Sequence, residues 1–340
     1  MQQRLTGGKK ERGRFIISLD FEINWGVRDQ QTLDQYGTNL LGVRQAIPAM
    51  LELFQEFGLR VTWATVGLLF FSDKREMLAH LPNVQPQYSN PTLSPYLALD
   101  NVGANEAIDP YHFGHSLIEQ IRRTPGQEIA THTFCHYYCL ERGQTAESFR
   151  ADLEAAVQVA QKQNITLRSL VFPRNQYNAQ YLTICQDLGI TSYRGNEESW
   201  IYKERNEEQQ SLYKRGARLL DAYFNLSGPN CHALPKIAQQ FPFNIPASRF
   251  LRPWSARLQA LEELRLRRIL SAMEHAARNN EVFHLWWHPH NFGVNIPQNM
   301  AVLRRIAEYY HYLKSTYRME SQSMGDLAAE LHNCIPAIAS

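Results

Sequence analysis

Short apolar runs alternate with longer amphipathic stretches along most of the 340-residue chain. The apolar runs predict six strands between residues 15 and 287. Apolar residues at helical spacing predict helices between and after them. We expect strands over 15–19, 60–66, 128–131, 169–172, 190–193 and 282–287, and helices over 42–57, 70–81, 117–123, 146–163, 177–188, 207–220, 258–279, 298–317 and 324–331. Strand–helix units in succession favour a parallel α/β architecture, and the length favours a barrel over an open sheet.

Two proline-rich stretches interrupt this alternation, at residues 82–110 and 226–253. Long loops inside a compact domain are usually functional or disordered. Tyr88, Tyr96 and Leu97 favour an ordered lid for the first stretch, and the second is expected to be irregular.

The composition narrows the class of partner. Hydrophobic residues make up 44% of the chain, and 35 basic and 33 acidic residues nearly cancel to a net charge of +2. This balance lacks the basic excess of proteins that bind nucleic acid or anionic membranes. No apolar run reaches the roughly 18 residues of a membrane helix, and residues 15–19 are too short for a signal-peptide core. The five cysteines, an odd number, fit a reducing compartment better than a set of disulfides. We therefore predict a cytoplasmic protein.

Acidic and histidine side chains come directly after the predicted strands. Asp20 and Glu22 lie at the end of the first strand, and alternate residues of an extended chain point to one side. They can therefore serve one site as metal ligand and general base, with solvated turn acids as the alternative. His132 and His136 come after the strand at 128–131, where a helical turn would place both on one face. Neutral imidazoles bind zinc and similar ions, and unrelated structural histidines are the alternative.

Cys135 and Cys139 lie among these histidines. With His132 and His136 they would complete a Cys2His2 zinc set. However, compact zinc motifs separate their ligand pairs by a longer loop than this stretch provides. We therefore expect both cysteines to be small buried hydrophobic residues.

Later strands end in further candidates. Arg174 comes after the strand at 169–172, where it would pair with an acid at the barrel mouth and keep that acid ionised. The last long strand runs into His288, and alternation places Trp286 and His288 on one face. His288 is a candidate general acid because histidine titrates in the working pH range, and His290 competes with it.

Together these motifs resemble those of the polysaccharide deacetylase family, the NodB-homology carbohydrate esterases, over residues 14–292. His132, Thr133 and His136 match the family's H-[ST]-x-x-H motif in full. Asp20 matches the first aspartate of its T-F-D-D-G motif, whereas Phe21 replaces the second. The spacing from Asp20 to Glu22 is that of a subgroup with D-x-D or D-x-E acids.

The other motifs of the family are matched less closely. Arg174 is the counterpart of the arginine in R-x-P-Y, although the order of residues is shifted. Trp200 is the candidate for a motif that combines an acid with a tryptophan. His288 keeps the place of the late histidine, but Trp286 stands where the family has leucine.

The resemblance implies a fold, a cofactor and roles for these residues. It implies a distorted (β/α)7 barrel as a single domain over 1–340, with a core at 14–292 and C-terminal helices over 297–331. A divalent ion, usually zinc, would be bound by Glu22, His132 and His136. The catalytic residues would be Asp20 as base, His288 as acid and Arg174, and the substrate contacts Trp286, Tyr137 and His290.

The reaction expected from this resemblance is removal of an N-acyl group from a carbohydrate or a sugar intermediate of glycan biosynthesis. The favoured acyl group is acetyl. One alternative is hydrolysis of a non-sugar amide, such as a small cyclic amide, on the same barrel. Another is a sugar-binding relative without turnover, which the Phe21 replacement suggests. The test between them is whether Glu22 reaches an ion held by the two histidines. Which of Asp20 and Glu22 is the ligand also stays open.

Overall fold

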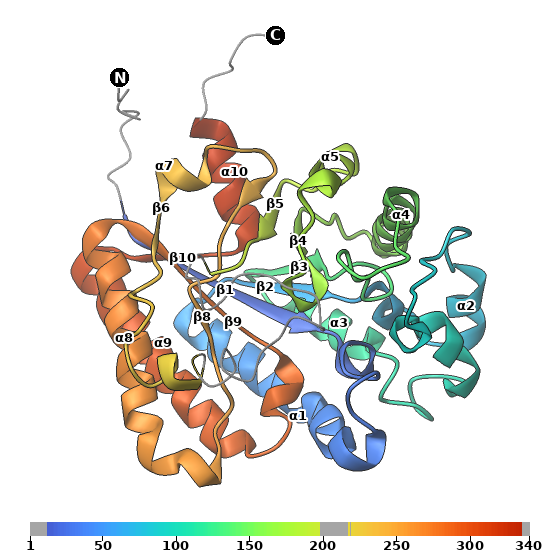
Figure 1. Cartoon of the computed structure of the whole chain (residues 1–340). Coiled ribbons are helices and arrows are strands. Elements are labelled where there is room, and N and C mark those ends of the chain that lie inside the picture. The colour runs from blue at the N-terminus through green and yellow to red at the C-terminus, as the bar shows by residue number, and fades with distance from the viewer. Residues whose placement is uncertain (1–11, 198–216, 218, 335–340) are drawn as a thin grey trace.

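A curled, largely parallel sheet forms the centre of the fold, as Figure 1 shows. The computed structural model describes residues 12–197, 217 and 219–334. Its strands are β1 (Arg14–Phe21), β2 (Val61–Thr65), β3 (Gln127–Thr131), β4 (Ser169–Val171), β5 (Ser192–Arg194), β6 (His232–Ala233), β7 (Phe243–Asn244), β8 (Arg249–Phe250), β9 (Glu281–Trp287) and β10 (Glu320–Gln322). The predicted α/β fold with a distorted barrel is confirmed, and β1 to β5 and β9 are the six predicted strands.

The order of the strands brings the first strand, β1, next to the last two, β9 and β10. The sheet runs β6-β9-β1-β2-β3-β4-β5-β7, with β10 beside β1 and β8 beside β9. Every pairing is parallel except that of β6 with β9. As a result, the carboxyl ends of β1 and β9, which are far apart in sequence, lie next to each other.

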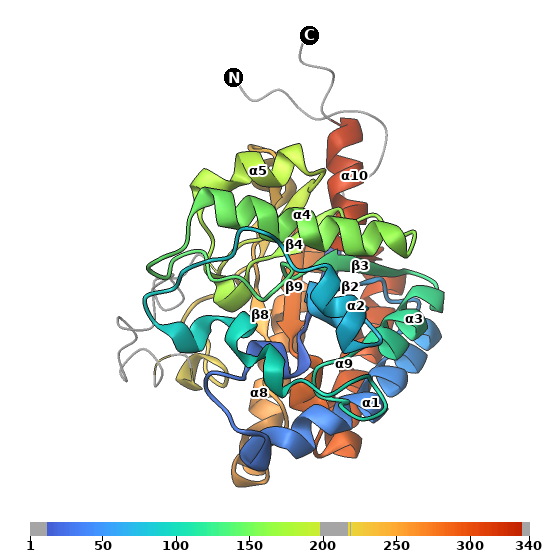
Figure 2. The same cartoon turned by 90° about the vertical axis from the view of Figure 1, so that its right-hand side faces the viewer.

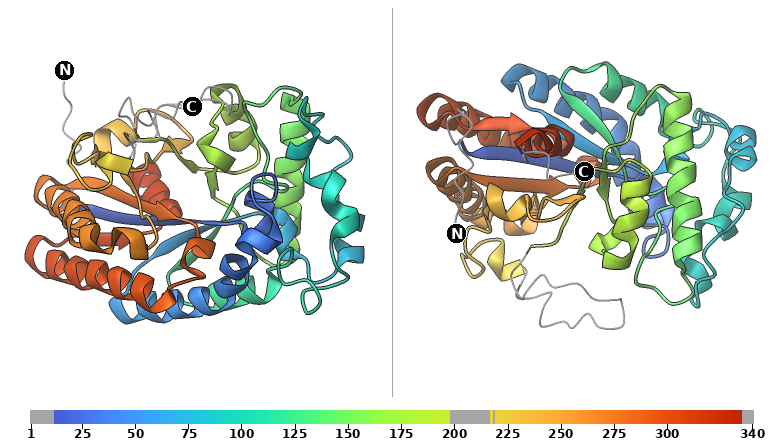
Figure 3. Two further views of the ribbon diagram at one scale, coloured as in Figure 1. Left: turned by 60° about the horizontal axis from the view of Figure 1, so that its bottom comes forward. Right: turned by 90° about the horizontal axis from the view of Figure 1, so that it is seen from above.

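Helices cover the outside of the sheet. The long helices α1, α8 and α9 pack together on the flank beside β1 and β9, while α4 and α5 lie beside β4 and β5 (Figures 2 and 3). The helices are α1 (Leu33–Phe57), α2 (Lys74–Ala79), α3 (His115–Arg123), α4 (Ala146–Lys162), α5 (Leu182–Asp187), α7 (Leu234–Ile237), α8 (Glu262–Asn279), α9 (Ile296–Tyr317) and α10 (Met324–Cys334). None of the described helices combines the length and apolar character needed to cross a bilayer.

Several helix boundaries differ from the sequence-based prediction. Helix α1 begins at Leu33 and not at residue 42, because tertiary packing overrides the low helix propensity of Gly37 and Gly42. Helix α2 is shorter than the predicted 70–81, because Asp73 caps it by accepting a hydrogen bond from the Glu76 N–H. Most of the helix predicted over 207–220, like Trp200, lies outside the described residues.

Strand alternation separates an apolar outer face from an inner face that contains polar residues. On β1, the side chains of Phe15, Ile17 and Leu19 belong to the main hydrophobic core. Ile16 belongs to a second core cluster, in which it packs with residues of α10 such as Met324. Further along the same inner face come Ser18 and Asp20. Helix α10 thus covers the amino end of the barrel, and the polar side chains lie toward its carboxyl end.

The stretch over 226–253, predicted to be irregular, contains β6, α7, β7 and β8, so that prediction was wrong. Residues 243–251 pass from one edge of the sheet to the other. The backbone N–H groups of Ile245 and Ala247 donate to β5 and the residue after it, and those of Ser248 and Leu251 donate to β9. Such two-residue strands have no sequence period of their own, and they exist because these partners satisfy their backbone groups.

Two glycines of α1 give a direct test of how closely this helix packs against the loop that follows β9. A Cβ on Gly42 would lie 1.8 Å from the Gly293 carbonyl oxygen, in the loop after His288–Asn291. A Cβ on Gly37, in the same helix, would make ordinary contact at 3.5 Å with Tyr111. We expect Gly42→Ala to lower the free energy of unfolding by about 1–3 kcal/mol, measured by urea denaturation.

The matched control is Gly37→Ala, which should be neutral or slightly stabilising because alanine favours the helix. Equal stability of the two variants would show that α1 does not approach residue 293 as closely as described.

Candidate metal and active site

Three candidate metal ligands converge at the carboxyl end of the barrel. Glu22 comes after β1, and His132 and His136 lie in the loop after β3. The Glu22 Oε2 atom is 3.2 Å from His132 Nε2 and 3.0 Å from His136 Nε2. In the described part of the chain, these residues form the one group of three His, Cys, Asp or Glu side chains close enough to hold a metal ion. Glu22 therefore does reach the histidines.

The two imidazole rings are oriented by their other nitrogens. His132 Nδ1 donates to the Val171 carbonyl at 2.8 Å, and His136 Nδ1 lies 3.2 Å from the Tyr138 hydroxyl. A histidine ligand is typically fixed in this way by a partner on its far nitrogen. Because His132 Nδ1 donates, the lone pair of the neutral ring is on Nε2, the buried atom that faces Glu22. A divalent ion fits this set of donors.

The protonation states suit metal binding as well. Burial lowers the pKa of His136 to about 4, which keeps its ring neutral. Burial alone would raise the pKa of Glu22, but the neighbouring His288, His132 and His136 hold it well below its ordinary value. A neutral imidazole and an ionised carboxylate are the forms that bind metals.

The loop between the histidines is not the helical turn that the spacing suggested. Thr133 and His136 adopt left-handed backbone conformations, with φ of 63° and 61°. The Tyr137 N–H donates to Thr133 Oγ1 at 2.7 Å, and the Phe134 and Cys135 N–H groups donate to the Asp152 carboxylate at 2.7 and 3.1 Å. Polar side chains thus replace the helical hydrogen bonds.

Left-handed residues other than glycine gather around this site. Ile23, Arg174 and Asn175 have φ of 45°, 53° and 54°. Each such residue costs roughly 1–2 kcal/mol, and the cost is high for a β-branched side chain such as that of Ile23. Backbone strain of this kind persists where the surrounding structure enforces it, and it clusters at functional sites.

The cysteines take no part in the cluster. Cys135 and Cys139 are fully buried and belong to the hydrophobic core. Neither is in the group of candidate ligands. The prediction of small buried hydrophobic residues is confirmed, and the structure gives no support to a Cys2His2 site in the described residues.

Asp20 is held by an arginine that was not selected from the sequence. The Arg194 guanidinium, at the end of β5, donates two hydrogen bonds to the Asp20 carboxylate at 2.6 and 2.8 Å. Burial raises the pKa of Asp20, but the Arg194 charge outweighs that effect and keeps the pKa below its ordinary value. Arg194 stands at the end of a predicted strand, so the rule that drew attention to Arg174 would have found it.

Arg174 itself pairs with Asp29 and stacks over the Tyr138 ring, with its guanidinium carbon 4.5 Å from the ring centroid. The prediction that Arg174 pairs with an acid is met, and that acid is Asp29. Arg174 therefore supports the aromatic residue behind His136.

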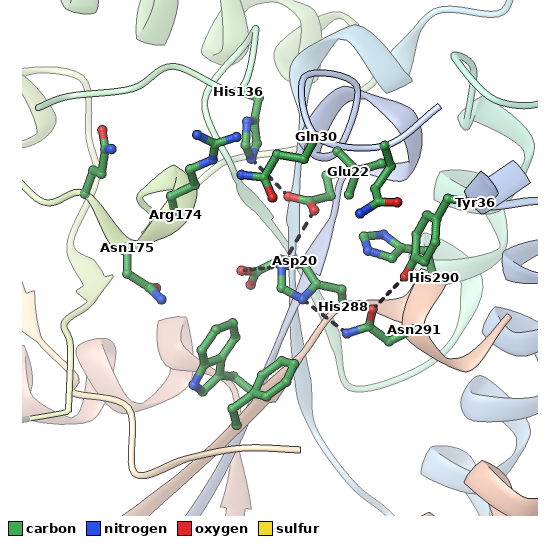
Figure 4. Close-up of a pocket in the computed structure, with 16 residues that line it drawn as sticks. Asp20, Glu22, Gln30, Tyr36, His136, Arg174, Asn175, His288, His290 and Asn291 are labelled. Carbon is green, nitrogen blue, oxygen red and sulfur yellow. Dashed lines mark hydrogen bonds and ion pairs between the residues drawn. The ribbon is translucent and has the colours of Figure 1, made fainter. Parts of the chain in front are cut away.

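His288 lies between the two acids, as Figure 4 shows. Its Nε2 is 3.7 Å from Asp20 Oδ2 and 3.6 Å from Glu22 Oε1. Its Nδ1 lies 3.5 Å from the Asn291 amide nitrogen, and the Tyr36 hydroxyl donates to the Asn291 amide oxygen at 3.0 Å. The Nε2 edge of the His288 ring therefore faces the two carboxylates.

These groups line a pocket with a volume of about 600 Å³. Amide and aromatic side chains make up much of its wall. The lining residues are Asp20, Glu22, Gly26, Val27, Gln30, Gln31, Tyr36, His136, Arg174, Asn175, Gln176, Phe250, Trp286, His288, His290 and Asn291. Phe250, Tyr36 and the amides were not selected from the sequence, because their segments have no metal-ligand or acid–base pattern.

Of the three residues predicted to contact substrate, Trp286 and His290 line the pocket and Tyr137 does not. Trp286 lies in the pocket wall, 4.7 Å from Phe250 between ring centroids. His290 also lines the pocket and stacks on His288, and burial lowers its pKa to about 3. Tyr137 is fully buried and does not line the pocket, and its hydroxyl bonds Ser148 Oγ at 2.7 Å.

The stretch over 82–110 does not contribute to the lining of this pocket, so it is not a lid over it. Tyr88 and Leu93 instead form a small core cluster with Tyr138. The Tyr88 hydroxyl accepts a hydrogen bond from the Tyr138 N–H at 2.8 Å. This stretch therefore supports the histidine loop from behind.

Comparison with known proteins identifies relatives by structure alone. No model of a protein family matches the sequence, and no curated protein does. The chain shares its fold with deacetylase-like and allantoinase structures. A Mycobacterium smegmatis protein named as a polysaccharide deacetylase has a TM-score of 0.57 at 14% identity, with 96% of this chain and 93% of that chain covered.

Two further structures give similar values. The Puue allantoinase has a TM-score of 0.58 at 12% identity, covering 99% of this chain and 95% of that one. A Pseudomonas aeruginosa protein named as a polysaccharide deacetylase has a TM-score of 0.53 at 12% identity, covering 94% and 91%. At these identities the similarity establishes the fold and not the reaction.

The Asp20–Arg194 pair leads to a prediction on stability. Arg194→Ala leaves a buried carboxylate without its cation, which typically costs about 3–5 kcal/mol. We expect that loss in urea denaturation at pH 7. The control Arg304→Ala removes an exposed partner of Glu56 and should change stability little.

The loss should also depend on pH. The lowered pKa of Asp20 in the wild type means that the pair stabilises the fold above about pH 4, and that this stability is lost as the pH falls through the folded pKa. In Arg194→Ala, burial without the arginine should raise the pKa of Asp20. The variant should therefore gain stability as the pH falls and Asp20 takes up a proton. The difference between wild type and variant should narrow from pH 7 to pH 4, and a constant difference would contradict the assignment.

Proposed function

We propose that this protein is a metal-dependent amide hydrolase that removes an N-acyl group, acetyl first among the candidates, from a carbohydrate. One observation carries the proposal. Three ligand atoms, from Glu22, His132 and His136, converge beside Asp20 and His288 at the edge of one pocket. A set of metal ligands, a base and an acid within a few ångströms of one another are the groups that hydrolysis of an amide requires.

Zinc is the ion that we propose for this site. Two neutral imidazoles and one carboxylate form a donor set that catalytic zinc sites use, with a further position left for water or substrate. Bound there, the ion would lower the pKa of a water molecule and polarise the acyl carbonyl. The geometry supports one division of roles between the two acids, with Glu22 as the ligand, since its Oε2 contacts both imidazoles, and Asp20 as the base.

The protein residues carry the proton transfers. Asp20 is ionised and fixed by Arg194, so it can accept the proton of the attacking water without changing its position. His288 faces the same space with Nε2, and in its imidazolium form that atom can donate a proton to the leaving nitrogen and leave a neutral ring. The two groups differ in environment, as a base and an acid in one reaction must: Asp20 is buried against Arg194, whereas His288 is partly exposed in the pocket.

The pocket wall supports a sugar as the substrate. Trp286 and Phe250 offer flat apolar surface for the face of a sugar ring. Gln30, Asn175 and Asn291 offer amide donors and acceptors for hydroxyl groups. The volume of about 600 Å³ suits a substrate larger than one small ring.

A second candidate is hydrolysis of a cyclic amide. The similarity to an allantoinase structure favours it, because that relative shares the fold over nearly the whole chain. A binding protein without turnover was suggested by Phe21, which stands where the family has an acid. The position of Glu22, within reach of both histidines, favours the hydrolase over that alternative.

Metal content tests the ligand assignment. We expect about one equivalent of zinc or a similar ion in the wild type by elemental analysis, and its loss in His132→Ala plus His136→Ala, because two of three ligands are removed. Glu22→Gln should lose most of the metal, whereas Asp20→Asn should keep it. Metal retained by Glu22→Gln and lost by Asp20→Asn would reverse the roles of the two acids.

Activity tests the reaction. With N-acetylated hexosamine oligomers, Asp20→Asn and His288→Gln should each lower kcat by about 10²- to 10⁴-fold, because a proton transfer is lost while the metal stays bound. Free acetate is the product to measure. Allantoin in the same preparation is the comparison: turnover of allantoin alone would support the second candidate, and turnover of neither by metal-loaded protein would refute both.

A further inference from the structure

Asp152 is a buried carboxylate that the proposed reaction does not use. It lies in α4, is fully buried, and is not part of the pocket lining. Within the described residues it makes no ion pair with a basic side chain. An ionisable group in a core without a cation is costly unless hydrogen bonds compensate for its lost hydration. Its partners therefore indicate its role.

Those partners are in the loop between the two histidines. The Phe134 N–H donates to Asp152 Oδ2 at 2.7 Å, and the Cys135 N–H donates to Oδ1 at 3.1 Å. Each carboxylate oxygen thus takes one backbone donor from the loop. In a buried segment without helix or sheet hydrogen bonds, those two N–H groups would otherwise be unsatisfied.

The opposite side of the loop is held by the chain after β2. The Gly67 and Leu68 N–H groups donate to the carbonyls of Thr133 and Phe134 at 2.9 and 3.0 Å. The loop is therefore fixed on its carbonyl side by backbone and on its amide side by Asp152. This matters because Thr133 and His136 are in left-handed conformations, which the chain does not adopt without support.

We propose that Asp152 is a positioning residue of the metal site. This inference rests on the metal-dependent function proposed above. Its carboxylate holds residues 133–135 in the bent conformation that brings His132 Nε2 and His136 Nε2 to the same Glu22 oxygen. It acts on the metal only through the backbone of the loop. Asp152→Asn keeps the shape of the side chain but turns an NH2 group toward one of the two backbone donors.

The experiment compares two buried aspartates that each accept backbone hydrogen bonds. Asp221 is also fully buried, and its Oδ1 accepts from the Leu226 and Ser227 N–H groups at 3.0 and 2.8 Å. It also pairs with Arg249, so its substitution should cost stability without altering the histidine loop. Zinc affinity would be measured with a competing chromophoric chelator, and melting temperature on metal-free protein, for the wild type, Asp152→Asn and Asp221→Asn.

Asp152→Asn should bind zinc about 10- to 100-fold more weakly, the range typical for loss of an outer partner of a metal ligand. Asp221→Asn should keep the wild-type affinity even where its melting temperature falls. Unchanged affinity in folded Asp152→Asn, or an equal loss in Asp221→Asn, would overturn the proposal.

A second pair of variants covers the case in which Asp152→Asn does not fold. Asp152→Glu retains the charge and both acceptor oxygens but moves them by one methylene, and Asp221→Glu is its control. We expect Asp152→Glu to bind zinc more weakly than Asp221→Glu, as for the asparagine variants. Equal zinc affinity of the two glutamate variants would overturn the positioning role. A wild type that binds no metal would refute the proposed function itself, whereas zinc bound equally well by wild type and Asp152 variants would refute only the positioning role.

Discussion

The site depends on one contact, the approach of two imidazole nitrogens to a single oxygen of Glu22, at 3.2 and 3.0 Å inside a buried region. Bringing a carboxylate and two rings out of water is unfavourable unless each polar atom finds a partner. Much of the local structure can be understood as meeting that condition. The Val171 carbonyl and the Tyr138 hydroxyl contact the Nδ1 atoms of the two rings, and the Nε2 atoms of both rings converge on Glu22.

A second buried charge pair extends the same constraint through the barrel. Arg194 reaches Asp20 from β5, and it also donates to Ser18 at 3.0 Å, deeper on the inner face of β1. Ser18 in turn bonds His284 of β9 at 2.8 Å. The inner faces of β1, β5 and β9 are thus linked by polar contacts across the barrel. These contacts fix Asp20 relative to the strand that leads to His288.

The barrel geometry explains why the polar groups gather at one end. Parallel strands present their carboxyl ends at the same edge, so residues that come after different strands meet there. At the other end, α10 fills the interior with Met324 and Leu327 against Ile16 and Val282. Residues 243–251 complete the wall between β5 and β9 and place Phe250 beside Trp286. Segments with little regular pattern therefore decide the shape of the pocket.

How far the site could be predicted differs between its parts. Asp20, Glu22, His132 and His136 were selected from position alone, because each comes after a strand whose apolar run is plain in the sequence. Arg194 was missed although it ends such a run, since Ser192–Arg194 is a three-residue strand and Arg174 fitted the family motif better. Tyr137 was selected as an aromatic residue beside the candidate ligand His136, but the direction of a side chain in a bent loop depends on φ values that residue spacing does not give.

The sequence by itself determined the strand–helix order, the apolar and polar faces of the main strands, and the residue types that meet at their ends. Those features are local, since they depend on a period of two or 3.6 residues and on the few residues directly after each strand. Tertiary structure decided which arginine holds Asp20, how residues 243–251 join β5 to β9, and how Asp152 bends the histidine loop. Each of these depends on contacts between segments far apart in the chain, and the energy of burying and satisfying polar groups is defined only once those segments have packed.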